Sequence, residues 1–190
     1  MPTTGYIDFT TAANVAGGGA DWTTPASCIV ADDTNRASVD VSALDIDTSD
    51  YMRISGLTTG IPTGATIDQI VVDYLCMASQ AAVLRCSGIY LARGGTQISS
   101  AITSGSTWGL TEAYKSNTFS SAIMGAGWTA ANIDSMQVYM KVLTTSDDII
   151  TGSVDYARVT VTYTEAATDP WSSGKPAPMS YRLNKRRRSP

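Results

Sequence analysis

The sequence contains no histidine, few charged residues and no long apolar run, and each shortage removes a class of function. Without histidine the chain has no Ser-His-Asp or Cys-His nucleophile, no histidine zinc site and no imidazole acid or base. No apolar run approaches the roughly 18 residues of a membrane span, and the N-terminus lacks the basic and apolar regions of a signal peptide. We therefore expect a protein that is made in the cytosol and makes no membrane contact.

Cysteine is scarce as well. Cys28, Cys76 and Cys86 show no metal-binding spacing, and three thiols cannot all pair within one chain. Buried free thiols are the simpler interpretation, and a cross-strand disulfide between Cys76 and Cys86 is the alternative. Neither interpretation implies a cofactor, and we expect none.

What the sequence does contain is a series of short segments rich in Thr, Val, Ile and Tyr, separated by Gly, Pro, Asp and Ser. In residues 156–164, Ala157, Val159 and Val161 alternate with polar residues, which is typical of a half-buried antiparallel strand. Further strands are expected over residues 6–12, 27–32, 50–57, 66–77, 135–144 and on both sides of Gly94-Gly95 within 82–102. A short helix is expected after Thr129 as its N-cap. This pattern predicts an all-β fold, an antiparallel β-sandwich of jelly-roll type over residues 1–164.

The composition changes after Thr164. Residues 165–190 carry six Lys and Arg and two Asp and Glu, a net charge of +4, whereas residues 1–164 carry seven and fifteen, a net charge of −8. Four prolines and the loss of alternation exclude a further central strand in residues 165–190. We interpret residues 165–190 as an extended basic C-terminal arm.

Several motifs in the body occur in an order that resembles a known family. They are "DWTTPASCIVADD" (21–33), "DYMRISGL" (50–57), "IPTGATIDQIVVDYL" (61–75), "IYLARGGTQI" (89–98), "GWTAANIDSMQVYMKV" (127–142) and "GSVDYARVTVTYT" (152–164). Together they resemble a β-sandwich family of virion structural proteins of tailed bacteriophages. The resemblance covers roughly residues 20–164, and the strand "VVDYLC" departs from the Arg-rich pattern usual in that family.

The resemblance implies a building block of the virion with no reaction to catalyse. It implies a capsid decoration or cement protein, often a homotrimer, whose partners are the major capsid protein or other virion proteins. A neck, tail or fibre-attachment component is the alternative within the virion, because the fold is reused at several positions. From other classes, a host-surface carbohydrate-binding module and a glycosidase remain open.

Carboxylates are the candidates for cation binding or catalysis. Asp32, Asp33, Asp40, Asp45, Asp47 and Asp50 lie close together in the sequence. A calcium loop also needs a Gly at its bend and a bidentate Glu, which this stretch lacks, so we expect solvated turn carboxylates, with a weak cation site as the alternative. Asp147, Asp148 and Glu112 are candidates for a glycosidase pair, although neighbouring aspartates on a loop tip are usually solvated. No metal site and no catalytic residue are assigned.

Aromatic residues are the candidates for ligand contacts. Trp22 and Trp128 occupy motif positions and are expected in the core, whereas Trp108 could be a core residue or could stack on a sugar. Trp171 lies on the arm, where it could anchor the chain in a partner's pocket.

The arm combines apolar anchors with a cationic end, as a docking segment would. Nucleic-acid binding is less favoured, because the body is acidic and no aromatic side chain lies within the basic run to stack on bases. Contact with packaged DNA and an incidental tail remain as alternatives. The residues expected to bind the partner are Trp171, Met179, Tyr181, Leu183, Lys185, Arg186, Arg187 and Arg188.

Overall fold

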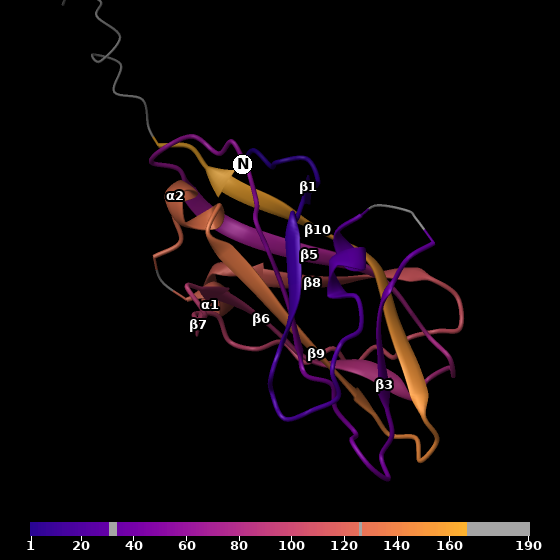
Figure 1. The fold of residues 1–190 in the computed structure, drawn as a ribbon. Coiled ribbons are helices and arrows are strands. Elements are labelled where there is room, and N and C mark those ends of the chain that lie inside the picture. Colours follow the sequence, from indigo (N-terminus) through magenta and orange to yellow (C-terminus); the bar gives the residue numbers. More distant parts are fainter. Residues whose placement is uncertain (31–33, 126, 167–190) are drawn as a thin grey trace, which may run out of the picture.

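The computed structural model describes residues 1–30, 34–125 and 127–166, and two antiparallel sheets packed face to face make up most of it (Figure 1). Sheet A has the order β1 (Ile7–Asp8), β10 (Ile150–Thr164), β5 (Thr66–Ala78) and β8 (Ala113–Ser120), and β3 (Ala37–Val41) also pairs with β10. Sheet B has the order β2 (Thr11–Val15), β4 (Tyr51–Ser55), β9 (Met136–Thr144), β6 (Leu84–Arg93) and β7 (Thr96–Gln97).

The chain alternates between the two sheets along most of its length. Strands β3, β5, β8 and β10 belong to sheet A, and β4, β6 and β9, which come between them in the sequence, belong to sheet B. This crossing from one layer to the other is the jelly-roll arrangement. The predicted antiparallel β-sandwich is therefore confirmed for the described residues.

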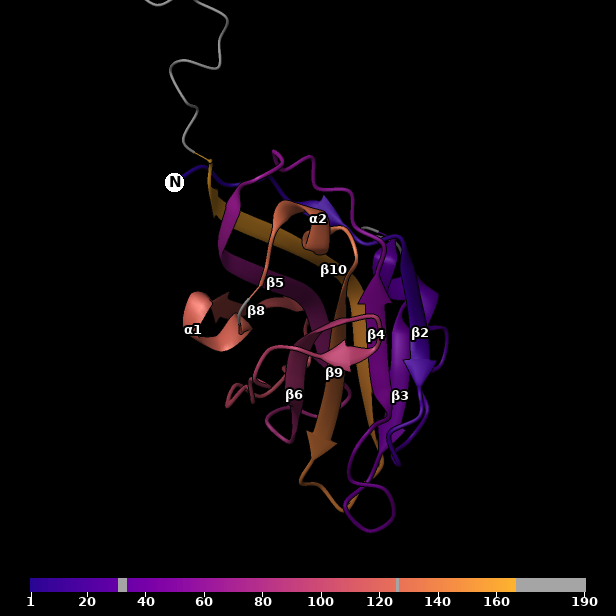
Figure 2. The same ribbon diagram turned by 90° about the vertical axis from the view of Figure 1, so that its left-hand side faces the viewer.

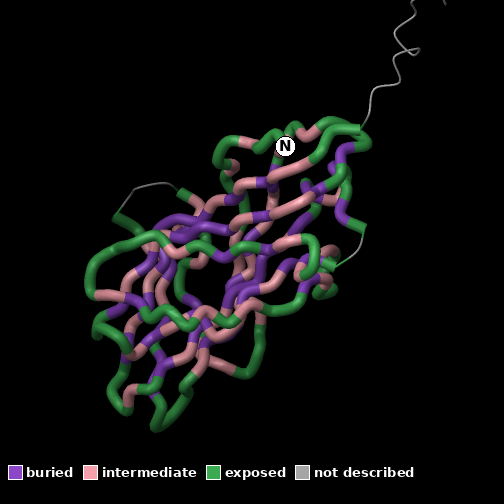
Figure 3. Tube along the Cα trace, turned by 180° about the vertical axis from the view of Figure 1, so that it is seen from behind, coloured by how far each residue is buried: buried purple, intermediate pink, exposed green. Residues whose placement is uncertain are grey.

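The core lies between the sheets and is built from alternate residues of the long strands. On β5 the inward residues Ile70, Val72 and Tyr74 are buried, and Val138 and Met140 are buried in the same way on β9. Figure 3 shows buried segments through the middle of the molecule and exposed segments mainly in the loops. Burial of this apolar surface is the main term that stabilises the fold.

Short helices occupy some of the connections. Helix α2 (Ala130–Ile133) follows Thr129, as predicted, although the Thr129 hydroxyl makes no capping hydrogen bond. Helix α1 (Ser121–Met124) lies beside β8 at one edge of the fold (Figure 2). No helix among the described residues is both long enough and apolar enough to cross a membrane.

One predicted strand is wrong and two observed strands were missed. Residues expected to form a strand over 27–32 instead belong in part to the 3-10 helix η1 (Pro25–Ile29), in which Pro25 occupies the first turn, where a missing amide hydrogen has no cost. Strands β3 and β8 were not expected, because their sequences "ASVDV" and "AYKSNTFS" hold too few large apolar residues to show alternation.

The C-terminal arm cannot be compared with the structure. Residues 167–190, which include Trp171, Met179, Tyr181 and the basic run from Lys185 to Arg188, lie outside the described residues. The arm therefore stays a prediction.

Three tryptophans are part of the core. Trp22 and Trp128 are buried, as expected, and their indole N–H groups donate to the carbonyl oxygens of Asp50 and Met124 at 2.9 and 2.8 Å. Trp108 is also buried, with 1% of its surface exposed, and its ring lies 6.1 Å from that of Tyr74. The option that Trp108 stacks on a sugar is therefore wrong.

Replacement of Trp108 by alanine should cost stability rather than ligand binding. The Trp108→Ala change leaves a large cavity between the sheets, so we expect the free energy of unfolding to fall by about 3–5 kcal/mol. Urea denaturation followed by circular dichroism measures the change. Leu110→Ala, two residues away at a side chain that is 57% exposed, is the control and should cost less than about 1 kcal/mol. Equal losses in the two variants would contradict the core role of Trp108.

Candidate binding surface

Two of the predicted carboxylate candidates are engaged within the protein. Asp40 accepts a hydrogen bond of 2.6 Å from Thr151, and Glu112 forms an ion pair with Arg36. Among the residues that the structure describes, no group of acidic or cysteine side chains is arranged to hold a metal ion. Asp32 and Asp33 lie outside the described residues.

Asp50 differs from the other described aspartates of that candidate stretch, Asp40, Asp45 and Asp47, because it is buried. Its carboxylate accepts the backbone N–H groups of Gly17 and Gly19 at 2.7 and 2.8 Å, and the Asn14 amide donates to it at 3.2 Å. The hydrogen bonds from Gly19 and Gly17 lower the pKa of Asp50, because they stabilise the charged form. The expectation of a solvated turn carboxylate is therefore wrong for Asp50, which fastens the loop after β2.

The cysteines are free and buried, which confirms the simpler interpretation of their role. Cys76 lies on β5 in sheet A and Cys86 lies on β6 in sheet B, so the two are not neighbours on one sheet. Burial raises the pKa of Cys86 to about 11 and that of Cys76 to about 12. Thiols held in the neutral form are poor nucleophiles and poor metal ligands at neutral pH.

A cluster of tyrosines lies on the outer face of sheet B. Strand register places Tyr139 of β9 between Arg53 of β4 and Tyr90 of β6, and residues paired in this way share one face of a sheet. Tyr51 and Lys141, two positions along β4 and β9, lie on the same face. We call Tyr51, Arg53, Tyr90, Tyr139 and Lys141 the tyrosine face.

The three rings of the tyrosine face contact one another. Tyr90 and Tyr139 are stacked with their centroids 5.0 Å apart, and Tyr51 meets them edge-on at 5.5 and 6.1 Å. The Lys141 ammonium lies 5.5 Å from the centroid of the Tyr51 ring and donates to the carbonyl oxygen of Gly17 at 3.4 Å. Tyr139 is buried by its neighbours, whereas Tyr51 and Tyr90 remain partly exposed. The cluster therefore offers a preformed aromatic and hydroxyl-bearing surface.

This face is cationic although the body of the protein is acidic. Arg85 joins Arg53 and Lys141 on it, because Arg85 pairs with Leu143 on the outward side of β9. The outward positions of β2, β4, β6 and β9 carry no Asp or Glu. The Nε groups of Arg53 and Arg85 are buried and have no hydrogen-bond partner among the described residues. An anionic or hydroxyl-rich ligand could supply acceptors to these guanidinium groups.

The outer face of sheet A has a different character. The Arg158 guanidinium lies between the rings of Tyr6 and Tyr114, 3.5 and 4.2 Å from their centroids, and its Nε is 3.7 Å from a carboxylate oxygen of Asp73. Ser116 donates to the other oxygen of Asp73 at 2.5 Å. Here the positive charge already faces a carboxylate within the protein, although the Arg158 Nε, like those of Arg53 and Arg85, has no hydrogen-bond partner among the described residues.

The sequence contained part of the signal for the tyrosine face. The alternation in residues 135–144 places Tyr139 and Lys141 opposite the apolar residues, as the structure confirms. What could not be read from the chain is that β4 and β6 flank β9, which brings together tyrosines about 40–50 residues apart in the sequence.

Comparison with known proteins gives similarity in structure only. No protein-family model matches the sequence, and no curated protein matches it. One similar solved structure is described as "CBM4 structure and function", with 15% identity over 83% of this chain and 95% of that chain and a TM-score of 0.41. The N-terminal cellulose-binding domain of Cellulomonas fimi β-1,4-glucanase C shows 14% identity, coverage of 86% and 90%, and a TM-score of 0.39. TmCBM61 in complex with β-1,4-galactotriose shows 9% identity, coverage of 80% and 89%, and a TM-score of 0.40.

The packing of the tyrosine face should be visible in an alkaline titration. The pKa of Tyr90 is raised to about 12, first by burial and then by the nearby Tyr51 and Tyr139, whose phenolates would repel its own. Tyr51→Phe should therefore lower the pKa of Tyr90 toward 10, the ordinary value. The two-dimensional NMR signals of ring-labelled tyrosine, assigned with Tyr90→Phe, measure this pKa. Tyr114→Phe, on the other sheet, is the control, and an unchanged Tyr90 pKa in Tyr51→Phe would contradict the contact.

Proposed function

We propose that this chain is a non-enzymatic binding module and that the tyrosine face binds carbohydrate. The observation that carries the proposal is the grouping of three tyrosines with Arg53 and Lys141 on one open sheet face. Aromatic side chains pack against the C–H faces of sugar rings, and their hydroxyls exchange hydrogen bonds with sugar hydroxyls. Arginine and lysine donate to sugar oxygens and pair with carboxylates.

The charge of the face selects an acidic polysaccharide as the ligand. Arg53, Arg85 and Lys141 are unopposed by any carboxylate on the outward positions of their strands. The rest of the body is acidic and would repel a polyanion, so the ligand is confined to this face. A uronic-acid polymer has both the ring faces and the carboxylates that such a surface recognises.

Binding to polygalacturonate tests this proposal. We expect Tyr90→Ala and Arg53→Ala each to weaken binding at least tenfold, because each removes a side chain at the centre of the face. Isothermal titration calorimetry with polygalacturonate oligomers measures the affinity, and cello-oligosaccharides test the preference for charge. Tyr114→Ala on sheet A is the matched control and should bind as the unmodified protein does. Binding that is lost in Tyr114→Ala but kept in Tyr90→Ala would refute the assignment.

A second proposal concerns the setting in which the protein acts. We propose that the chain is a structural protein of a tailed-bacteriophage virion, most simply a capsid decoration or cement protein, with a neck, tail or fibre position as the alternative. What supports it is the resemblance, whose motifs are spread over the whole sandwich: the Pro62–Gly64 turn before β5, the Gly94-Gly95 hairpin between β6 and β7, Trp128 before α2, and β10. Glycan binding and a virion position are compatible, since a virion surface protein could contact glycans of the host.

Copy number in purified particles tests the virion proposal. A decoration protein covers a shell with many equivalent positions, so we expect hundreds of copies per particle. Quantitative mass spectrometry of purified virions, with the major capsid protein as the internal reference, measures the number. A dozen or fewer copies would place the protein at the neck, tail or fibres, and its absence from the particle would refute the proposal.

A further inference from the structure

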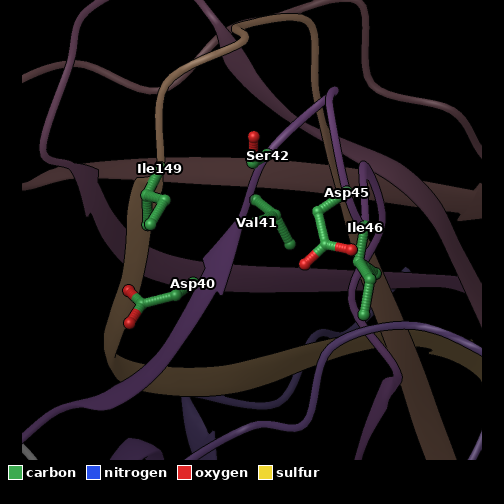
Figure 4. Close-up of a pocket in the computed structure, with 6 residues that line it drawn as sticks. All are labelled: Asp40, Val41, Ser42, Asp45, Ile46 and Ile149. Carbon is green, nitrogen blue, oxygen red and sulfur yellow. The ribbon is translucent and has the colours of Figure 1, made fainter.

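Exposed aliphatic side chains gather at one end of the sandwich. Leu44 and Ile46 in the loop between β3 and β4, and Ile149 just before β10, are 78%, 40% and 73% exposed. Ile46 and Ile149 line a small cavity of about 170 Å³, shown in Figure 4, and Leu44 lies two residues before Ile46. Its lining residues are Asp40, Val41, Ser42, Asp45, Ile46 and Ile149. We call Leu44, Ile46 and Ile149 with this cavity the end patch.

The end patch has an acidic rim. Asp40, Asp45 and Asp47 lie beside it on the first segment, and Asp147 and Asp148 lie on the second, while neither segment 37–50 nor segment 143–151 contains Lys or Arg. The side chains of Asp45, Asp47, Asp147 and Asp148 make no hydrogen bond or ion pair with another described residue. Exposed apolar groups beside four unpaired carboxylates mark a surface that gains from burial against a cationic, partly apolar partner.

We propose that the end patch receives the C-terminal arm of a second copy of this chain. The arm carries the complementary chemistry in one stretch, residues 179–188, "MSYRLNKRRR". Met179, Tyr181 and Leu183 supply apolar side chains for the cavity and its aliphatic border. The same stretch has five cationic residues, equal in number to the five carboxylates of the rim. They are Arg182, Lys185, Arg186, Arg187 and Arg188.

The positions of the two elements favour docking between copies over docking within one. β10 begins beside the end patch at Ile150 and ends at Thr164, at the opposite end of the sandwich (Figure 1). Its length is about 45 Å at the rise of an extended strand. Met179 lies 13 residues beyond Ala166, a stretch that reaches at most about 45 Å when fully extended. For Met179 to reach the end patch of its own copy, most of residues 167–179 would have to be extended, whereas the patch of a neighbouring copy imposes no such constraint.

The resulting contact joins unlike surfaces, the arm of one copy and the end patch of the next. Head-to-tail contacts of this kind produce a closed ring or an open chain, depending on the rotation between copies. A ring of three would produce the trimer that the family resemblance implies. This inference rests on neither proposed function, because it uses only the end patch and the sequence of the arm.

Charge reversal of the full-length protein tests the inference. One variant combines Asp45→Lys, Asp147→Lys and Asp148→Lys, and a second combines Arg186→Glu, Arg187→Glu and Arg188→Glu. We expect each variant alone to self-associate at least tenfold more weakly than the unmodified protein, since its arm and end patch then carry charges of the same sign. An equimolar mixture of the two should associate again, because each arm then meets an opposite charge. Sedimentation velocity over a range of protein concentrations and salt measures all four samples.

Two controls keep the outcome unambiguous. Asp68→Lys reverses a partly exposed carboxylate near the start of β5, at the far end of the sandwich, and should leave association unchanged. Circular dichroism confirms that the substituted loops leave the fold intact. The inference is overturned if the unmodified protein is a monomer at every concentration, if either reversed variant associates normally, or if the mixture fails to recover.

Discussion

The packing of Trp108 between the two sheets is the constraint on which the rest of the structure depends. Gly152 of β10 and Leu84 of β6 come so close that a Cβ atom on residue 152 would lie 2.5 Å from Leu84 and 3.3 Å from the Trp108 ring. Any other residue would fit there only if the Leu84 side chain shifted. Tyr74 on β5 closes the same cluster, with its ring tilted against that of Trp108. Sheet A and sheet B are thereby joined where β5 and β9 end, since Gly152 pairs with Ala78 and Leu84 pairs with Thr144.

A core filled in this way leaves little internal space for a ligand, so recognition falls to the outer faces and the loops. The two outer faces differ in whether their cationic side chains have carboxylate partners. On sheet A, Arg158 is matched by Asp73 and by two aromatic rings, which makes the face self-contained. On sheet B, Arg53 stands beside Tyr139, and no carboxylate occupies the outward positions of β2, β4, β6 and β9. A cationic face with no opposing carboxylate can pair with an anionic ligand, which is why the tyrosine face is the better candidate for function.

Much of the fold could be predicted from the sequence, because a strand with one buried face has apolar residues at every second position. β5, β9 and the second half of β10 show this alternation clearly. β8 does not, since only Asn117 and Phe119 are buried on it. The strand expected over 27–32 is wrong because the residues after Pro25 form a 3-10 helix instead. Tertiary packing overrides the strand preference of these residues. The burial of Asp50 could not be predicted from the sequence either, because it depends on the loop of Gly17 and Gly19 folding back over the carboxylate.

The candidate surfaces were harder to predict from the sequence, because they too depend on tertiary structure. The tyrosine face needs three strands in a particular lateral order, and lateral order is set by how the whole chain crosses between sheets. The end patch likewise joins two loops about 100 residues apart, which are brought together by the pairing of β3 with the start of β10. A single sequence records which residues face outward, and it does not record which of them become neighbours.

The two proposals, taken together, would connect the tyrosine face and the end patch through valency. An open sheet face contacts a polysaccharide on one side only, so each copy can bury little of its ligand and should bind weakly. A polymer presents the same unit many times, and copies linked by their arms would present the same face many times. Once one face is bound, the next binds at a high effective concentration, and the combined affinity rises without any new contact. Salt would oppose both steps, because the polyanion meets Arg53 and Lys141 while the basic arm meets the carboxylates around Ile149. Loss of avidity with rising ionic strength would therefore be steeper for the linked copies than for a single copy, since two screened interactions contribute to it instead of one.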